Sequence, residues 1–150
     1  MSEASDPLYR KELLRLAADA AGAGRLPQPH AAATAANPAC GDRITMQVAV
    51  AGGRVTALAH DTHACVITQA SAAILGAHAA GHTKDDLAAL KGAVAAMLKG
   101  GAVPSSPFAG YAVFEGVAAH PGRHSCVLLP LTALIDALET GEPGAQRSQA

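Results

Sequence analysis

The clearest pattern in this sequence is a run of alternating apolar and polar residues from Ile44 to Val50. A period of two is typical of a β-strand with one buried face, because successive side chains point to opposite faces of a sheet. The glycine pair Gly52-Gly53 follows this run and is a tight-turn signal. Residues 55–59 then form a second, shorter run. The sequence therefore predicts an antiparallel hairpin that turns at the two glycines.

Four other segments repeat their apolar residues every three or four positions, which indicates helices with one buried face. Asp6-Pro7 begins the first of them, since proline suits the first turn of a helix. The second starts at Cys65. The third starts at Thr83, where Asp86 lies three residues further on, as in a capping box. The fourth follows Cys126.

Three other stretches are less regular. Residues 23–39 are rich in Gly, Pro, Ala and Thr, and we interpret them as an ordered loop. A short helix is expected around residues 113–117. Pro130 lies within the fourth helical segment, where it removes one hydrogen bond and clashes with the carbonyl four residues back. We therefore expect the last helix to be kinked at this proline or to start later than Cys126.

These elements together predict an α+β fold. The hairpin of residues 43–60 is expected at the centre of a small antiparallel β-sheet, with several α-helices packed on one side. The chain has 150 residues, of which 50% are hydrophobic and 15% are charged, so it can bury a sizeable core. We expect one domain over residues 1–150, with a core from about 8 to 138 and a polar tail over 141–150.

Charge and hydropathy exclude several classes of partner. The formal net charge is −1, and the eleven Lys and Arg residues are scattered, so we expect neither a nucleic-acid partner nor an anionic membrane surface. The longest uncharged run, residues 62–83, contains Gln, Ser, Thr and His and is too polar to span a bilayer. The first residues lack the pattern of a secretory signal, and we therefore expect a cytoplasmic protein.

Cysteine usage is the main chemical signal. The three cysteines are Cys40, Cys65 and Cys126, and an odd number argues against a disulfide framework. Cys40 precedes the hairpin and Cys65 follows it 25 residues later, with the turn nearly midway, so both reach the same end of the hairpin. Asp42 lies two residues past Cys40 and points to the same side of an extended chain. The hairpin therefore gathers two thiols and one carboxylate.

The place of the third cysteine cannot be derived in this way, because Cys126 lies 61 residues beyond Cys65. Arg123 lies nearby and a helix follows, and both features favour the thiolate form of Cys126. Each cysteine can instead be a small buried hydrophobe, which is the usual role of a reduced cysteine. His60 and His63 could be further ligands, but a solvated or core role is the simpler interpretation.

Several of these features resemble the U-type scaffold family of iron–sulfur cluster assembly, which comprises IscU, SufU and the NifU amino-terminal domain. They are Asn37-Pro38-x-Cys40-Gly41-Asp42, the glycine-turn hairpin, Cys65 followed by Ser71, and a basic residue before Cys126-x-Leu128. The resemblance covers residues 8–138. It is closest to the SufU branch, because residues 83–101 look like the insertion of that branch and Ser125 stands where the IscU branch has histidine.

The resemblance implies one metal site with four ligands, namely Cys40, Asp42, Cys65 and Cys126. Zinc is the expected metal, with iron or a [2Fe–2S] cluster as the alternative. The implied function is to accept persulfide sulfur from a SufS-like cysteine desulfurase, first on Cys40 and as a second choice on Cys126. Arg123 is expected to contact this partner, and apo-proteins are expected to receive the clusters. Such a protein is a sulfurtransferase partner of the desulfurase and not an enzyme by itself.

Three other functions compete with that of a zinc-bound sulfur acceptor. A scaffold that assembles and passes on a [2Fe–2S] cluster would use the same residues. A zinc hydrolase would need an open metal position, which four protein ligands do not leave. A structural zinc module would bind the metal without taking up sulfur on Cys40.

Overall fold

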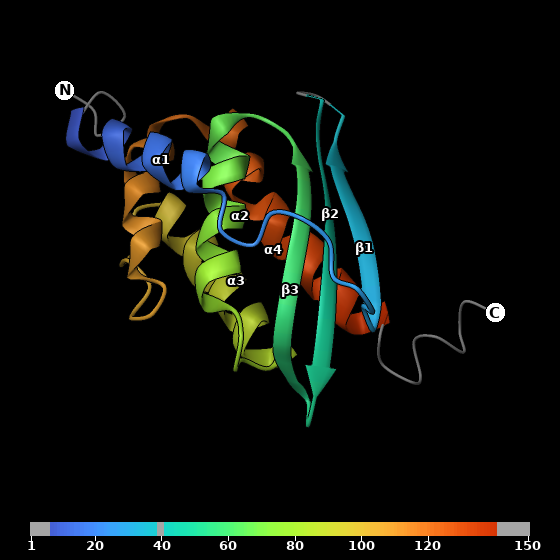
Figure 1. Ribbon diagram of the computed structural model, residues 1–150. Helices are drawn as coiled ribbons and strands as arrows, with labels where there is room; N and C mark the ends of the chain where they lie inside the picture. Colours follow the sequence, from blue (N-terminus) through green and yellow to red (C-terminus); the bar gives the residue numbers. More distant parts are fainter. Residues whose placement is uncertain (1–6, 39–40, 141–150) are drawn as a thin grey trace.

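The computed structural model describes residues 7–38 and 41–140 of the chain, so the predicted tail over 141–150 lies outside the described residues. Along these residues one helix is followed by three consecutive strands and then by the remaining helices, as Figure 1 shows. Their order is α1 (Pro7–Asp19), β1 (Ala31–Asn37), β2 (Asp42–Ala51), β3 (Arg54–His63), α2 (Val66–His78), α3 (Lys84–Leu98), the 3₁₀ helices η2 (Ala109–Ala119) and η3 (Pro121–Arg123), and α4 (His124–Thr140).

The sheet has three antiparallel strands in the order β1-β2-β3. The predicted hairpin is confirmed as β2 and β3, which are both longer than the alternating runs indicate. Gly52 and Gly53 connect the two strands with φ values of 61° and 77°, a backbone conformation that favours glycine. Ile44, Met46 and Val48 are completely buried, as the alternation predicts for one face of β2.

Strand β1 shows that the loop expected over residues 23–39 was wrong. Five of its seven residues are alanine, which is depleted in strands, so local propensity does not reveal the element. The strand forms because it pairs with β2 over its whole length, from Ala31 opposite Val48 to Asn37 opposite Asp42. Its small side chains also leave room for α4, which packs directly on β1.

The helices lie on one side of the sheet (Figure 1). Helix α4 crosses β1 and β2, α2 packs on β3, and α1 and α3 pack on these two helices. The buried core is built from aliphatic residues of the sheet, of α2 to α4 and of η2, together with Tyr111 and Phe114. This arrangement confirms the predicted α+β fold. No helix in the described part of the chain has the length and apolarity that crossing a membrane requires.

The boundaries of the later helices follow their local signals. Thr83 and Asp86 form the predicted capping box at the start of α3, with hydrogen bonds of 3.1 and 3.0 Å. The expected short helix is the 3₁₀ helix η2. Helix α4 begins before Cys126 and continues through Pro130, so the expectation of a later start was wrong. Because Pro130 has no N–H for the carbonyl of Cys126, that carbonyl instead accepts the Thr68 hydroxyl at 3.0 Å.

The segment that follows α1 is held tightly against β3 and α2. His60 is 4% exposed, and its Nε2 donates to the carbonyl of Ala21 at 2.9 Å. The backbones of Gly22 and His60 are joined by a hydrogen bond of 2.9 Å. On the other side Gly76 of α2 approaches the same segment so closely that a Cβ there would lie 2.0 Å from the oxygen of Ala21. The close approach therefore requires glycine at position 76.

Replacing Gly76 with alanine is expected to lower the free energy of unfolding by about 2 kcal/mol, because the Ala21 carbonyl must move and weaken its bond to His60. A loss of that size lowers the melting temperature by about 4–8 °C in a chain of this length. Gly92→Ala is the matched control, since its added Cβ meets nothing within 4 Å on helix α3. That variant should be slightly stabilised. Equal melting temperatures for the two variants would contradict the packing argument.

Candidate metal centre

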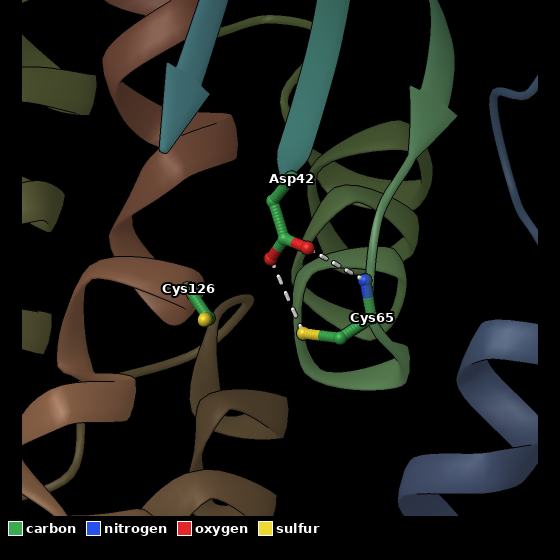
Figure 2. A group of neighbouring side chains, drawn as sticks. All are labelled: Asp42, Cys65 and Cys126. Atoms are coloured by element: carbon green, nitrogen blue, oxygen red, sulfur yellow. Dashed lines mark hydrogen bonds between the residues drawn. The ribbon is translucent and has the colours of Figure 1, made fainter. Parts of the chain in front are cut away.

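Three side chains from distant parts of the chain meet at one end of the hairpin (Figure 2). Asp42 is the first residue of β2, Cys65 is the N-cap of α2 two residues after the end of β3, and Cys126 lies in the first turn of α4. One ligand atom of each side chain lies within 4.8 Å of the other two. The structure therefore brings the thiol of Cys126 to Asp42 and Cys65, which the hairpin places close together.

The fourth residue of the predicted site, Cys40, lies outside the described residues. Pro38 and Gly41 are turn residues, and the Gly41 amide donates a hydrogen bond of 2.9 Å to the Asn37 carbonyl just before β2 begins. Gly41 has φ +74°, which favours glycine at this point of the motif. The Asn37 side chain donates to the Ser125 hydroxyl at 2.7 Å. This bond ties the end of β1 to the start of α4, next to Cys126.

Asp42 is only 4% exposed, and its carboxylate accepts hydrogen bonds from several donors. Its Oδ1 accepts the backbone N–H of Cys65 at 3.1 Å. Its Oδ2 accepts the Thr68 hydroxyl at 2.8 Å and the Cys65 thiol at 3.3 Å. Burial alone would raise the pKa of the Asp42 carboxyl, but the hydrogen bonds from Thr68, Cys65 and Cys126 together lower it below its ordinary value. Asp42 is therefore a carboxylate at neutral pH.

The two thiols differ in their exposure to solvent. Cys65 is partly exposed, whereas Cys126 is completely buried beneath the start of α4. Both are reduced. Thiolate sulfur and carboxylate oxygen are ligands that zinc accepts in tetrahedral sites, and thiolate also holds iron in iron–sulfur clusters. The donors present thus fit a thiolate-rich metal site, for which Cys40 would supply a further sulfur.

Two histidines that could have been ligands have other contacts. His63 lies on the exposed end of β3, where its Nε2 is 3.1 Å from Asp61 Oδ1. His60 is buried between Ala21 and Thr62. Neither belongs to the group of converging ligand atoms found among the described residues. The simpler interpretation of both histidines, in terms of solvated and core roles, agrees with these contacts.

Two more residues near these ligands bear on the site, one predicted from the sequence and one overlooked there. Arg123 ends η3, three residues before Cys126, and its side chain is exposed. Thr68 was not singled out in the sequence, although it touches both Asp42 and the backbone of Cys126. Its position three residues after Cys65 is the available signal, because residues three apart lie on the same face of a helix.

The fold and the cluster of two thiols and a carboxylate define a U-type scaffold of iron–sulfur cluster assembly. The family profile described as the NifU-like N terminal domain matches residues 8–127, and the chain belongs to this family. No protein with a curated description matches the sequence.

Solved structures agree with the family assignment. The crystal structure of a nitrogen-fixing NifU-like protein (N-terminal) from Brucella abortus is 32% identical, with a TM-score of 0.85 over 98% of this chain and 99% of that one. A protein from the thermophilic Fervidobacterium islandicum AW-1 is proposed as an iron–sulfur cluster assembly scaffold for the SUF system. It is 24% identical, with a TM-score of 0.79 over 89% of this chain and 98% of that one, and this likeness supports the fold alone.

Proposed function

We propose that this protein is a zinc-bound sulfur acceptor of the SufU type, which takes persulfide sulfur from a SufS-like cysteine desulfurase for cluster assembly in the cytoplasm. The observation that carries the proposal is the convergence of Asp42, Cys65 and Cys126 within 4.8 Å in a scaffold of the NifU-like family. Cys40, two residues before Asp42, is the proposed fourth ligand. Zinc, when bound, keeps thiols deprotonated at neutral pH.

The proposed acceptor of the sulfur is Cys40. Its thiolate attacks the outer sulfur of the desulfurase persulfide, a new S–S bond forms on Cys40, and the desulfurase thiolate leaves, so that no net oxidation occurs. Cys126 is the second choice, but its thiol is completely buried and a partner's persulfide cannot reach it in this conformation. The half-buried Cys65 is anchored by its backbone N–H, which donates to Asp42 Oδ1 at 3.1 Å. Exposure and anchoring therefore support Cys40 as the first acceptor.

A groove next to the metal site offers a docking surface for the desulfurase. It has a volume of about 480 Å³ and lies between α1, the start of α2, and the helices η2 and η3. Its apolar lining begins at Val66, the residue after Cys65, and includes the exposed Leu14. Arg10 and Arg123 give its rim positive charge. A partner surface with an apolar residue and acidic neighbours would complement this groove.

The direct test of the proposal uses the full chain, a SufS-type desulfurase and cysteine. Native mass spectrometry should show one zinc per chain before the reaction and added sulfur after it. A gel shift of the alkylated protein should then locate the sulfur on Cys40, and Cys40→Ser should abolish the shift. A protein that holds zinc but gains no sulfur would be a structural zinc module, and the proposed function would be wrong.

Charge reversal at Arg123 is expected to raise the KM for the desulfurase several-fold, because it removes an attraction that steers the partner to the groove. Zinc content and kcat should change little, since the exposed Arg123 side chain is not a metal ligand. Lys99→Glu, on the exposed C-terminal cap of α3, is the matched control and should leave the KM unchanged. The difference between the two variants should shrink at high salt. Equal KM values at low salt would remove Arg123 from the docking surface.

A second function, assembly of a [2Fe–2S] cluster on the same residues, is favoured by the membership of the family itself. The cluster would then be the cargo, and apo-proteins would receive it. Aerobic purification followed by metal analysis separates the two functions. Zinc without visible absorbance supports the sulfur acceptor, whereas iron with sulfide-to-iron absorbance supports the cluster scaffold.

A further inference from the structure

We propose that Thr68 is a positioning residue that controls how readily Asp42 leaves the bound metal, because its hydroxyl alternates between two acceptors. The inference rests on the metal site of the proposed function and concerns the exchange of one of its ligands. It requires neither the desulfurase nor the identity of the sulfur acceptor. The role of Thr68 and the sulfur-acceptor function can therefore be tested separately.

The two acceptors of Thr68 are within hydrogen-bonding distance at the same time. Its Oγ1 lies 2.8 Å from Asp42 Oδ2 and 3.0 Å from the carbonyl oxygen of Cys126, while the Cys65 sulfur is more distant at 3.6 Å. The hydroxyl has a single proton, so it donates fully to one of these oxygens at a time. Thr68 is completely buried, and solvent does not compete for this proton. The position of the proton therefore depends on which of the two oxygens is the stronger acceptor.

The second acceptor exists because of Pro130. In an uninterrupted helix the carbonyl of Cys126 would accept the N–H of the residue four positions on, but that residue is Pro130, which has no N–H. The carbonyl is thus available to Thr68 from the neighbouring helix. Pro130 in α4 thus leaves the Cys126 carbonyl to accept the hydroxyl of Thr68 in α2. The same hydroxyl also contacts the carboxylate of Asp42.

Metal binding changes the balance between the two acceptors. The Cys65 thiol must lose its proton to bind a metal, so the hydrogen bond that it donates to Asp42 is lost. Oδ2, the oxygen that the Cys65 thiol faces, is also the oxygen that Thr68 contacts. If Asp42 held a metal, the Thr68 hydroxyl could still donate to the carbonyl of Cys126.

The same hydroxyl makes the departure of Asp42 easier. The departure of a carboxylate from a metal in a buried site is unfavourable unless the carboxylate gains hydrogen bonds. Thr68 can turn from the Cys126 carbonyl to Oδ2, while the Cys65 amide continues to hold Oδ1. This hydrogen bond speeds up ligand exchange at Asp42.

A purely structural role for Thr68 is the alternative, in which its hydroxyl simply joins α2 to α4. Ser71 provides the matched comparison, because it is also completely buried on α2 and donates to a carbonyl of α4, that of Val127, at 2.7 Å. Its hydroxyl also contacts the Tyr111 hydroxyl at 3.0 Å, and among the described residues it makes no hydrogen bond to Asp42. Ser71→Ala therefore removes a similar link between the helices without touching the carboxylate.

The test is the rate at which zinc-loaded protein releases its metal to an excess of a chromophoric chelator. Thr68→Val keeps the size and branching of the side chain but removes the hydroxyl, and it should slow zinc release about ten- to a hundredfold. This is the factor expected from losing a hydrogen bond to a charged acceptor. Thr68→Ser, which restores the hydroxyl, should release zinc at the wild-type rate. Ser71→Ala should do so as well.

A double variant decides whether Thr68 acts through Asp42. In an Asp42→Ala background the further change Thr68→Val should have no effect on zinc release, because the group that it controls is absent. Unchanged or faster release in Thr68→Val, or equal slowing in Ser71→Ala, would overturn the proposal. If Thr68→Val does not fold, Thr68→Ala replaces it with the same expected result.

The outcomes separate this inference from the proposed function. Wild-type zinc release from Thr68→Val, together with normal sulfur uptake by the wild type, would reject the role of Thr68 alone. Slowed release without any sulfur uptake by the wild type would reject the sulfur-acceptor function alone. Absence of metal binding in the wild type would reject the metal site and the role of Thr68 with it.

Discussion

Replacing Cys65 with serine is expected to remove the bound zinc and to lower the melting temperature of the purified protein. Cys65 contributes one of the two described sulfurs of the site, and serine is a poor ligand for zinc. A metal that binds the folded state at 100 times its Kd stabilises that state by about 2.7 kcal/mol. The variant should therefore melt about 5–10 °C below the zinc-bound wild type. Metal analysis and a thermal melt of the same sample check this result.

The metal-free wild type is the control for this variant. In the absence of metal the Cys65 thiol donates to Asp42 Oδ2 at 3.3 Å, and a serine hydroxyl can make the same bond. Cys65→Ser should therefore melt at the temperature of the chelator-treated wild type, and adding chelator to the variant should change nothing. A wild type whose melting temperature is unaffected by chelator would show that metal binding is not coupled to folding.

The sequence is informative wherever a signal is local. The alternation in β2 and the glycine turn predict the hairpin, and the hairpin alone brings Asp42 close to Cys65. The capping box at Thr83 predicts the start of α3 in the same way. In each case the residues that define the element are close in sequence and interact directly. A pattern of this kind needs no knowledge of the rest of the fold.

The parts that could not be predicted depend on contacts between distant segments. Strand β1 is alanine-rich and forms because β2 offers it a partner and α4 covers it. Cys126 reaches the site because α4 crosses the sheet, which no spacing in the sequence encodes. The later helix start expected because of Pro130 was wrong for the same reason, since the Thr68 hydroxyl that satisfies the carbonyl of Cys126 comes from another helix.

The change Asp42→Ala is expected to leave metal bound but to slow the onward transfer of sulfur or cluster. Among three thiolates the carboxylate is the hard donor, so it is the ligand that a soft site releases most easily. Its loss leaves sulfur ligation or a bound water and removes the easy route to exchange. Persulfide transfer, followed by a gel shift of the alkylated protein, and metal content on the same sample measure both quantities.

The main alternative for Asp42 is that it only holds the turn, since aspartate after glycine is common in turns. Its bonds to the Cys65 amide and to Thr68 would then be its whole role, and the variant would lose stability without losing transfer. Asp61→Ala is a suitable control, because Asp61 is an exposed carboxylate on β3 that pairs with His63. Transfer should be slowed in Asp42→Ala and normal in Asp61→Ala, at a temperature where both are folded. Full transfer with normal metal content in Asp42→Ala would show that this carboxylate only holds the turn. The exchange attributed to Thr68 would then have no ligand to act upon.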